Sequence, residues 1–109
     1  MRHGAALVVF ALVAWPLAAS AQNTLTAQQR HGRQILTQNC NLCHLPQSPG
    51  EKTYGPILNK AAANGDDALM KEVILNGLVR MPAWKYTLSS SDVDDIIAYV
   101  RTLPAPAAQ

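Results

Sequence analysis

The sequence has few of the side chains that build a large core or a charged binding surface. Of its 109 residues only 6% are aromatic and 15% are charged, and the formal net charge is +2. No stripe of Lys and Arg interleaved with aromatic residues is present, which argues against nucleic-acid binding. Internal repeats are absent. The only two cysteines lie in one short motif, so there is no disulfide framework.

No hydrophobic run is long enough for an ordinary membrane-spanning helix. The apolar run at residues 5–19 is shorter than the roughly 20 residues that such a helix needs. It follows the positively charged start Met1-Arg2-His3 and ends at the small residues Ala19-Ser20-Ala21. This pattern predicts a signal peptide over residues 1–21 that is cleaved after Ala21 on export. An uncleaved N-terminal anchor is the alternative.

The remaining chain has room for one domain, which we expect over residues 22–103, followed by a disordered Pro/Ala tail at 104–109. A domain of this size has a marginal core, and such small scaffolds usually need a disulfide, a metal or another bound group.

The motif Cys40-Asn41-Leu42-Cys43-His44 indicates which group is bound, because its spacing matches covalent attachment of a c-type haem. Two cysteines three residues apart on a helical turn can each bond one vinyl group on the same haem edge, and the adjacent histidine then lies under the iron. A thiol–disulfide pair has the same cysteine spacing, but it usually lies in a βαβ unit, which the sequence does not predict. A zinc site from the two cysteines, His44 and His31 is the other alternative, with poor ligand spacing.

A helix is predicted to begin at Thr26, which forms a capping pattern with Gln29, and to run to about Asn39, delivering the motif. Gly32 lowers helix propensity inside it by roughly 1 kcal/mol relative to alanine. Either another helix approaches closely at this glycine, or the glycine is tolerated on a solvated face. His31 is expected on the surface.

Two further helices are predicted, with loops between. One covers residues 66–76, begins with the acidic pair Asp66-Asp67 and ends at Gly77; Met70 lies in its apolar stripe and is expected to fill the core. The other has Ser89 as its N-cap, an apolar stripe reaching Leu103, and Pro104 as its stop.

Met81 lies outside any helical pattern, in Arg80-Met81-Pro82-Ala83-Trp84, and the following proline favours an extended backbone. A histidine on one face of the iron leaves the other face for a second ligand, and Met81 suits that position. Simple packing of Met81 on the core is the alternative. Trp84 and Tyr86 are expected to wall the haem pocket.

These residues resemble the small monohaem class I cytochromes c of bacteria. The likeness covers nearly all of the chain after residue 21 and rests on the Cys40–His44 motif, Tyr54-Gly55-Pro56, Met81-Pro82-Ala83-Trp84 and the helix around Ile96-Ile97-Ala98-Tyr99-Val100. The resemblance implies an all-α cytochrome c fold, with three or more helices wrapped around one covalently attached haem.

The resemblance also implies site roles. His44 and Met81 would be the axial ligands of the iron, the Pro56 carbonyl would receive the second ring N–H of His44, and Gly32 with Leu36 would pack against Ile96 and Tyr99. Leu36 is a departure, because an aromatic residue often occupies that site.

An iron with two protein ligands has no open position for a substrate, so the expected function is one-electron transfer by a soluble periplasmic carrier, not catalysis. By resemblance, a dehydrogenase or a quinol-oxidising complex would donate electrons and a terminal oxidase or reductase would accept them. A tightly bound subunit of a periplasmic dehydrogenase is the alternative. A ligand-binding or catalytic haem protein remains if Met81 is not on the iron.

Overall fold

A computed structural model describes residues 25–105 of the chain. The predicted signal peptide at 1–21 and most of the predicted tail lie outside this range. Within it the elements are α1 (Ala27–Asn39), α2 (Asn41–His44), the short 3-10 helix η1 (Ala62–Gly65), α3 (Asp67–Asn76) and α4 (Ser90–Val100). The described part contains no β-strand, which confirms the all-α prediction, and none of its helices is long and apolar enough to cross a membrane.

Capping residues predicted from the sequence, Thr26 and Ser89, begin two of the three longer helices. The Thr26 hydroxyl accepts the backbone N–H of Gln29 at 3.1 Å, and the Gln29 side chain accepts the Thr26 N–H at 3.0 Å. Ser89 and Asp92 form the same reciprocal pair at the start of α4. Each pair satisfies two backbone donors that the first helical turn leaves open, so the helix starts follow from local sequence.

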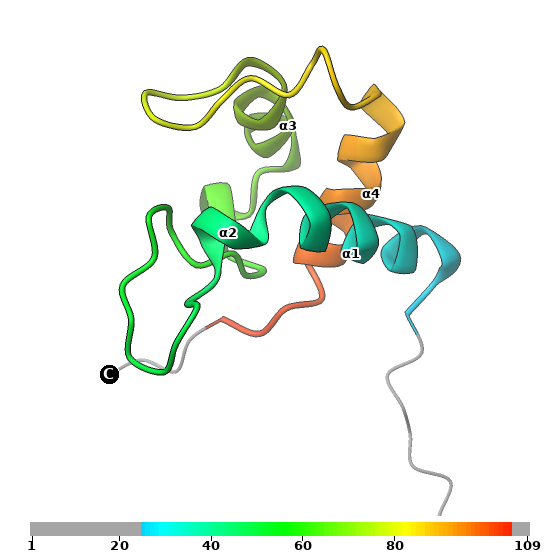
Figure 1. The fold of residues 1–109 in the computed structure, drawn as a ribbon. Helices are drawn as coiled ribbons and strands as arrows, with labels where there is room; N and C mark the ends of the chain where they lie inside the picture. The colour runs from blue at the N-terminus through cyan, green and yellow to red at the C-terminus, as the bar shows by residue number, and fades with distance from the viewer. Residues whose placement is uncertain (1–24, 106–109) are drawn as a thin grey trace, which may run out of the picture.

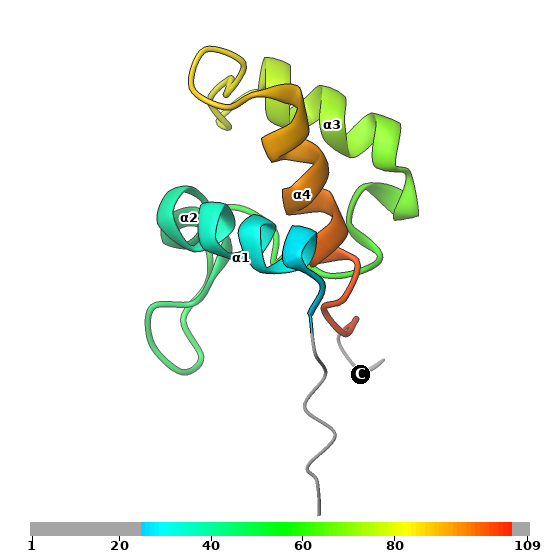
Figure 2. The same ribbon diagram turned by 90° about the vertical axis from the view of Figure 1, so that its right-hand side faces the viewer.

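Helix α4 lies between α1 and α3, and α1 crosses it closely (Figures 1 and 2). Gly32 lies at the crossing: a Cβ atom added there would be 1.8 Å from the carbonyl oxygen of Asp95. Of the two explanations for this glycine, close approach of a second helix is therefore correct. Leu36 is buried in the same core as Ile96, as the resemblance implied.

One core joins the three longer helices. None of the buried side chains in the described range is polar or charged. The buried members of the core are seven aliphatic side chains and one methionine: Ile35, Leu36, Met70, Ile74, Val93, Ile96, Ile97 and Val100. Met70 is a core residue, as predicted. The core contains no aromatic ring, consistent with the low aromatic content of the sequence.

The C-terminal end of α4 differs from the prediction. The helix ends at Val100 with Arg101 as its C-cap, before the expected stop at Pro104. The N–H groups of Thr102 and Leu103 bond to carbonyls three residues back, at 2.9 and 3.0 Å, and this tighter turning takes Leu103 out of the α-helix.

Candidate functional site

All six residues predicted to hold a cofactor line one cavity of about 580 Å³: Cys40, Cys43, His44, Pro56, Met81 and Trp84. They come from segments far apart in the sequence. The α2 segment and the loop after α3 lie on the same side of the crossing of α1 and α4, one below the other in Figure 1. The rest of the lining is mostly aliphatic and includes core residues of α3 and α4.

The two cysteines lie on one tight turn, as the motif predicted. Cys40 ends α1 and precedes α2, and its carbonyl accepts the N–H groups of Cys43 at 3.2 Å and His44 at 3.0 Å. Both are free thiols. Burial, and secondarily the neighbouring Cys43, raises the pKa of the Cys40 thiol to about 11.

The ring of His44 is held on two sides. Its Nδ1 lies 2.6 Å from the carbonyl oxygen of Pro56; since a carbonyl only accepts, Nδ1 carries the proton and donates. Gly55 packs on the ring, where an added Cβ atom would be 2.8 Å from Cε1. The remaining nitrogen, Nε2, is left with its lone pair, as a metal-binding imidazole requires.

Gly55 is a site residue to which the sequence analysis gave no role of its own, although Tyr54-Gly55-Pro56 was one of the segments that carried the resemblance. Its N–H donates to the Cys43 carbonyl at 2.8 Å, which fixes the loop against the attachment motif. A glycine directly before Pro56, whose carbonyl accepts the hydrogen bond from His44, was the available signal.

Met81 lies at the end of a tight turn. Leu78 and Met81 exchange two backbone hydrogen bonds, of 3.1 and 2.8 Å, so residues 78–81 fold back on themselves. Gly77 permits this: its φ is +78°, and an added Cβ atom would be 2.6 Å from the Met81 carbonyl oxygen. Trp84 ties the returning chain to α3 through its N–H, which donates to Ile74 at 3.0 Å.

Met70 also reaches the cavity lining from α3. The sequence predicted it as core only, and it is indeed 94% buried, with 6% of its surface exposed. Two methionines thus border the same cavity, Met70 from the interior of a helix and Met81 from a turn.

The prediction that Tyr86 walls the pocket is wrong. Tyr86 is 86% exposed and lies outside the cavity lining. The chain turns at residues 84–87, with the Thr87 N–H donating to the Trp84 carbonyl at 2.9 Å, so Trp84 faces inward and Tyr86 outward. Lys85 Nζ lies 5.3 Å from the centre of the Tyr86 ring.

Tyr54 and Arg80 also line the cavity, and neither was predicted as a site residue. The Arg80 guanidinium lies over the Tyr54 ring, 4.5 Å from its centre. Tyr54 precedes the segment that supports His44, and Arg80 precedes Met81. Neither partner has a local sequence pattern that predicts this contact.

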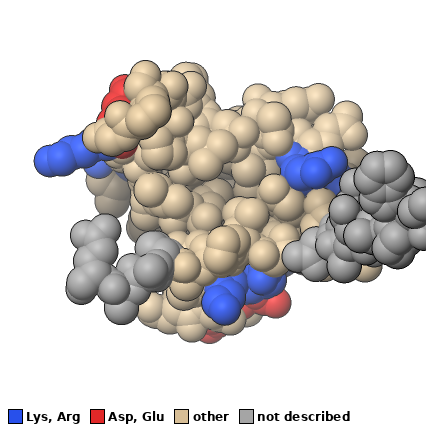
Figure 3. All heavy atoms as spheres, turned by 90° about the horizontal axis from the view of Figure 1, so that it is seen from below, with Lys and Arg blue, Asp and Glu red and all other residues tan. Residues whose placement is uncertain are grey.

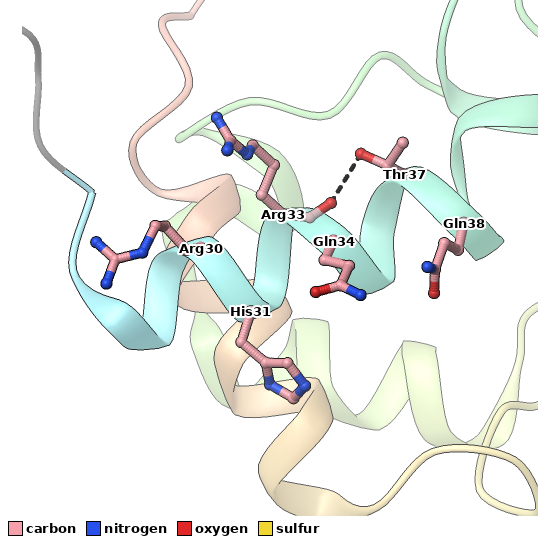
Figure 4. A pocket seen from close by; sticks show the side chains of 6 residues that line it. All are labelled: Arg30, His31, Arg33, Gln34, Thr37 and Gln38. Atoms are coloured by element: carbon pink, nitrogen blue, oxygen red, sulfur yellow. Dashed lines mark hydrogen bonds between the residues drawn. The ribbon is translucent and has the colours of Figure 1, made fainter.

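A second hollow lies on the outer face of α1 (Figure 4). The residues around it are polar and exposed, and their side chains point in different directions instead of converging on one point: Arg30, His31, Arg33, Gln34, Thr37 and Gln38. His31 is exposed, as predicted, and its Nδ1 pairs with Asp95 Oδ2 at 2.7 Å. The side chains around this hollow therefore form no binding site for a ligand.

Neither alternative for the cysteine motif gains support. In residues 25–105 no three His, Cys, Asp or Glu side chains are grouped to hold a metal ion, and His31 is paired with Asp95 away from the motif. The same range has no βαβ unit for a thiol–disulfide pair.

A haem fits these residues. The cavity volume lies within the usual range for cofactor sites, the lining is apolar, and two thiols and one oriented imidazole share an edge of it. With an apolar macrocycle in place, the wall side chains of α3, including the partly exposed Leu69, would be covered.

Comparison with known proteins gives the family. Residues 27–100 match the family described as cytochrome C oxidase, cbb3-type, subunit III. The cytochrome c subunit of 4-cresol dehydrogenase [hydroxylating] from Pseudomonas putida is 30% identical over 94 residues, which cover 85% of this chain and 78% of that protein.

Two further relatives agree. Cytochrome c6 from Synechocystis sp. is 34% identical over 70% of this chain and 66% of its own length. The cbb3-type cytochrome c oxidase subunit FixPc from Rhizobium leguminosarum bv. viciae is 32% identical over 66% of this chain and 26% of its own length. The cofactor of such proteins is a covalently attached haem c with its iron, and their role is electron transfer. The chain belongs to the cytochrome c family and is a small, all-α monohaem cytochrome c that transfers electrons and is not itself an enzyme.

Proposed function

We propose that Cys40 and Cys43 would hold a haem through thioethers, and that His44 Nε2 and the Met81 sulfur would ligate its iron. The observation that carries this proposal is the single apolar cavity that these four residues share with Pro56 and Trp84. The hydrogen bond from His44 Nδ1 to the Pro56 carbonyl supports it, since an acceptor on the other ring nitrogen orients a metal-binding imidazole and raises its basicity.

The haem, when bound, supplies a one-electron iron couple. The chain's own residues then determine how this couple is used. Two protein ligands leave no open position for a substrate, a thioether favours the reduced iron and raises the potential, and apolar walls exclude water. Rigid support of His44 by Gly55 and Pro56 keeps its position similar in both oxidation states.

Haem attachment is tested by the mass of the denatured protein after periplasmic expression with maturation machinery. We expect the mass of the chain from Gln22 plus one haem, because thioethers survive unfolding. A mass equal to that of the bare polypeptide would exclude covalent attachment. Single Cys40→Ala and Cys43→Ala variants should each retain at most one thioether.

We further propose that the protein acts in the periplasm after cleavage of residues 1–21, as a soluble carrier in a respiratory chain. The support is the charged start, the apolar run and the small residues before Gln22. N-terminal sequencing of protein from a periplasmic fraction tests it. A membrane-bound product that retains Met1 would instead support the uncleaved anchor.

The partners are redox proteins: a periplasmic dehydrogenase or quinol-oxidising complex as donor, and a terminal oxidase or reductase as acceptor. On the face in Figure 3 the charged side chains are few and scattered, with no continuous patch of either sign. Near Met81, Leu78 is 61% and Val79 99% exposed. These exposed apolar side chains beside Met81 favour a partner with an apolar docking face over one that depends on opposite charge.

A stable subunit of a dehydrogenase is the second candidate, supported by the relative that is a 4-cresol dehydrogenase cytochrome subunit. Purification from the native periplasm by gel filtration separates the two. A free carrier elutes at the size of the monomer, whereas a subunit co-elutes with a larger enzyme at constant stoichiometry.

A further inference from the structure

We propose that Arg101 is a positioning residue that holds one wall of the haem cavity in a strained conformation. The inference rests on the proposed haem site. It starts from η1, the short turn at Ala62–Gly65, whose residues Ala62 and Ala63 line the cavity. Nothing in the local sequence explains why this turn adopts its shape.

The backbone of the turn is left-handed at three successive residues. The φ angles are +54° at Ala63, +54° at Asn64 and +76° at Gly65. Residues other than glycine rarely adopt such angles, alanine even less readily than asparagine, and successive left-handed residues are less common still. Such strain persists only where surrounding contacts hold the backbone, so the turn requires a clamp.

Arg101 provides the contacts. Its Nη1 donates to the carbonyls of Lys60 at 2.9 Å and Ala62 at 2.8 Å, directly before the left-handed residues. Its Nε donates to Asp67 Oδ1 at 2.7 Å, two residues after them. The Arg101 side chain, at the end of α4, is thus hydrogen-bonded to the chain on both sides of the turn.

The backbone adds a second tie at the same place. The N–H of Lys60 donates to the Leu103 carbonyl at 3.0 Å, so the segment that follows α4 holds the chain before the turn from another side. Because α4 ends at Val100, residues 101–103 leave the helix and can contact the turn. Most of the Arg101 side chain is buried here, with 21% of it exposed.

Only arginine suits this geometry. Its guanidinium is planar and always charged, and it presents several donors in a rigid fork, whereas lysine offers one flexible ammonium group. Lysine at this position keeps the charge but cannot reproduce the contacts to two carbonyls and a carboxylate at once.

The consequence concerns the haem. Burial and exclusion of water around a haem are among the factors that set its reduction potential. If Arg101 holds the Ala62–Ala63 wall closed, its loss lets the turn relax and admits water. We therefore expect a lower reduction potential, with covalent haem and both axial ligands unchanged.

The test compares Arg101→Lys with Lys71→Gln in the holoprotein. Arg101→Lys keeps the net charge, so a change in potential cannot come from a lost charge. Lys71 also bridges α3 and α4, through Asp94 at 2.6 Å, but neither residue lines the cavity. We expect a lower potential and several-fold faster hydrogen exchange at the Asp66 amide, which donates to the Ala63 carbonyl, in Arg101→Lys only.

A rescue makes the test specific. Ala63→Gly removes the cost of the positive φ angle, so adding it to Arg101→Lys should restore much of the wild-type potential and slow the exchange. An unchanged potential in Arg101→Lys, an equal shift in Lys71→Gln, or no rescue by Ala63→Gly would each overturn the inference. If the wild-type protein lacks covalent haem or a methionine ligand, the proposed function fails instead, which mass and absorption spectra of the wild type reveal independently.

Discussion

The Nδ1 atom of His44 lies 2.6 Å from the carbonyl oxygen of Pro56, twelve residues further along the chain, and the intervening Gly55 packs on the imidazole ring. This relationship sets the tautomer and the direction of the ring from one loop. The loop therefore leaves Nε2 as the ring nitrogen available for the proposed bond to iron.

Gly55→Ala tests how closely that loop controls the ring. The new methyl group would lie 2.8 Å from Cε1 and 3.0 Å from Nδ1 of His44, so the ring has to turn or the loop has to move. We expect covalent haem to be retained, with a changed reduction potential and altered electron paramagnetic resonance of the oxidised iron. Ser48→Ala, at an exposed position of the same loop, is the control, for which we expect smaller changes in both.

Met81→Ala separates a carrier from a ligand-binding protein. We expect loss of the weak long-wavelength absorption band of iron–methionine bonding, a lower reduction potential, and binding of added imidazole at the open position, because a harder donor replaces the thioether. Rapid carbon monoxide binding by the reduced wild type would contradict this ligation and favour a ligand-binding or catalytic protein.

Met70→Ala is the matched control, because Met70 borders the same cavity but belongs to the core. We expect its absorption band to persist and its free energy of unfolding to fall by about 2 to 5 kcal/mol, the usual cost of truncating a buried methionine. If Met70→Ala, and not Met81→Ala, abolishes the band, the two assignments are reversed.

Gly32→Ala should separate the crossing helices. A Cβ atom 1.8 Å from the Asp95 carbonyl oxygen has no flexible neighbour to displace, so α1 and α4 have to move apart. We expect a loss of about 1 to 3 kcal/mol, or somewhat more, in chemical denaturation. Gln34→Ala, on the exposed side of the same helix, should change stability by no more than about 0.5 kcal/mol.

Asp92 makes the start of α4 sensitive to acid. Hydrogen bonds from the Ser89 hydroxyl and backbone lower the pKa of the Asp92 carboxyl below its ordinary value of 3.8. A carboxyl whose pKa is lower in the folded state stabilises the fold above its ordinary pKa, and this contribution is lost as the pH falls through the folded-state value. The melting temperature should therefore exceed that of Asp92→Asn at pH 7, and the difference should shrink toward pH 3. A difference that stays constant with pH would contradict the assignment.

Haem removal should unfold the chain. The cavity of about 580 Å³ adjoins a core of eight aliphatic or methionine side chains, which is little apolar mass for one domain. We expect far-ultraviolet circular dichroism of the Cys40→Ser/Cys43→Ser double variant without haem to show little helix. A cooperative melt from native-like helicity would contradict this expectation.

What the sequence by itself determined is local. Thr26 with Gln29, and Ser89 with Asp92, act between residues three apart, and the Cys40–His44 spacing is a property of one helical turn. Such contacts depend on the backbone of a single segment, so the patterns predicted helix starts and the cofactor class correctly. The approach at Gly32 was one of two explanations, because a glycine alone does not say what lies opposite it.

Only the tertiary structure decided the rest, because the contacts join residues far apart in the chain. Tyr86 turned outward because a turn begins at Trp84, and Met70 reached the cavity because α3 packs with α4 beside it. Arg101 has no sequence pattern that points to Lys60, Ala62 and Asp67; its partners lie 34 to 41 residues earlier and were brought together by packing of α4. The left-handed turn at Ala63 has no local preference to predict it, since it exists where long-range hydrogen bonds outweigh the backbone's own preference.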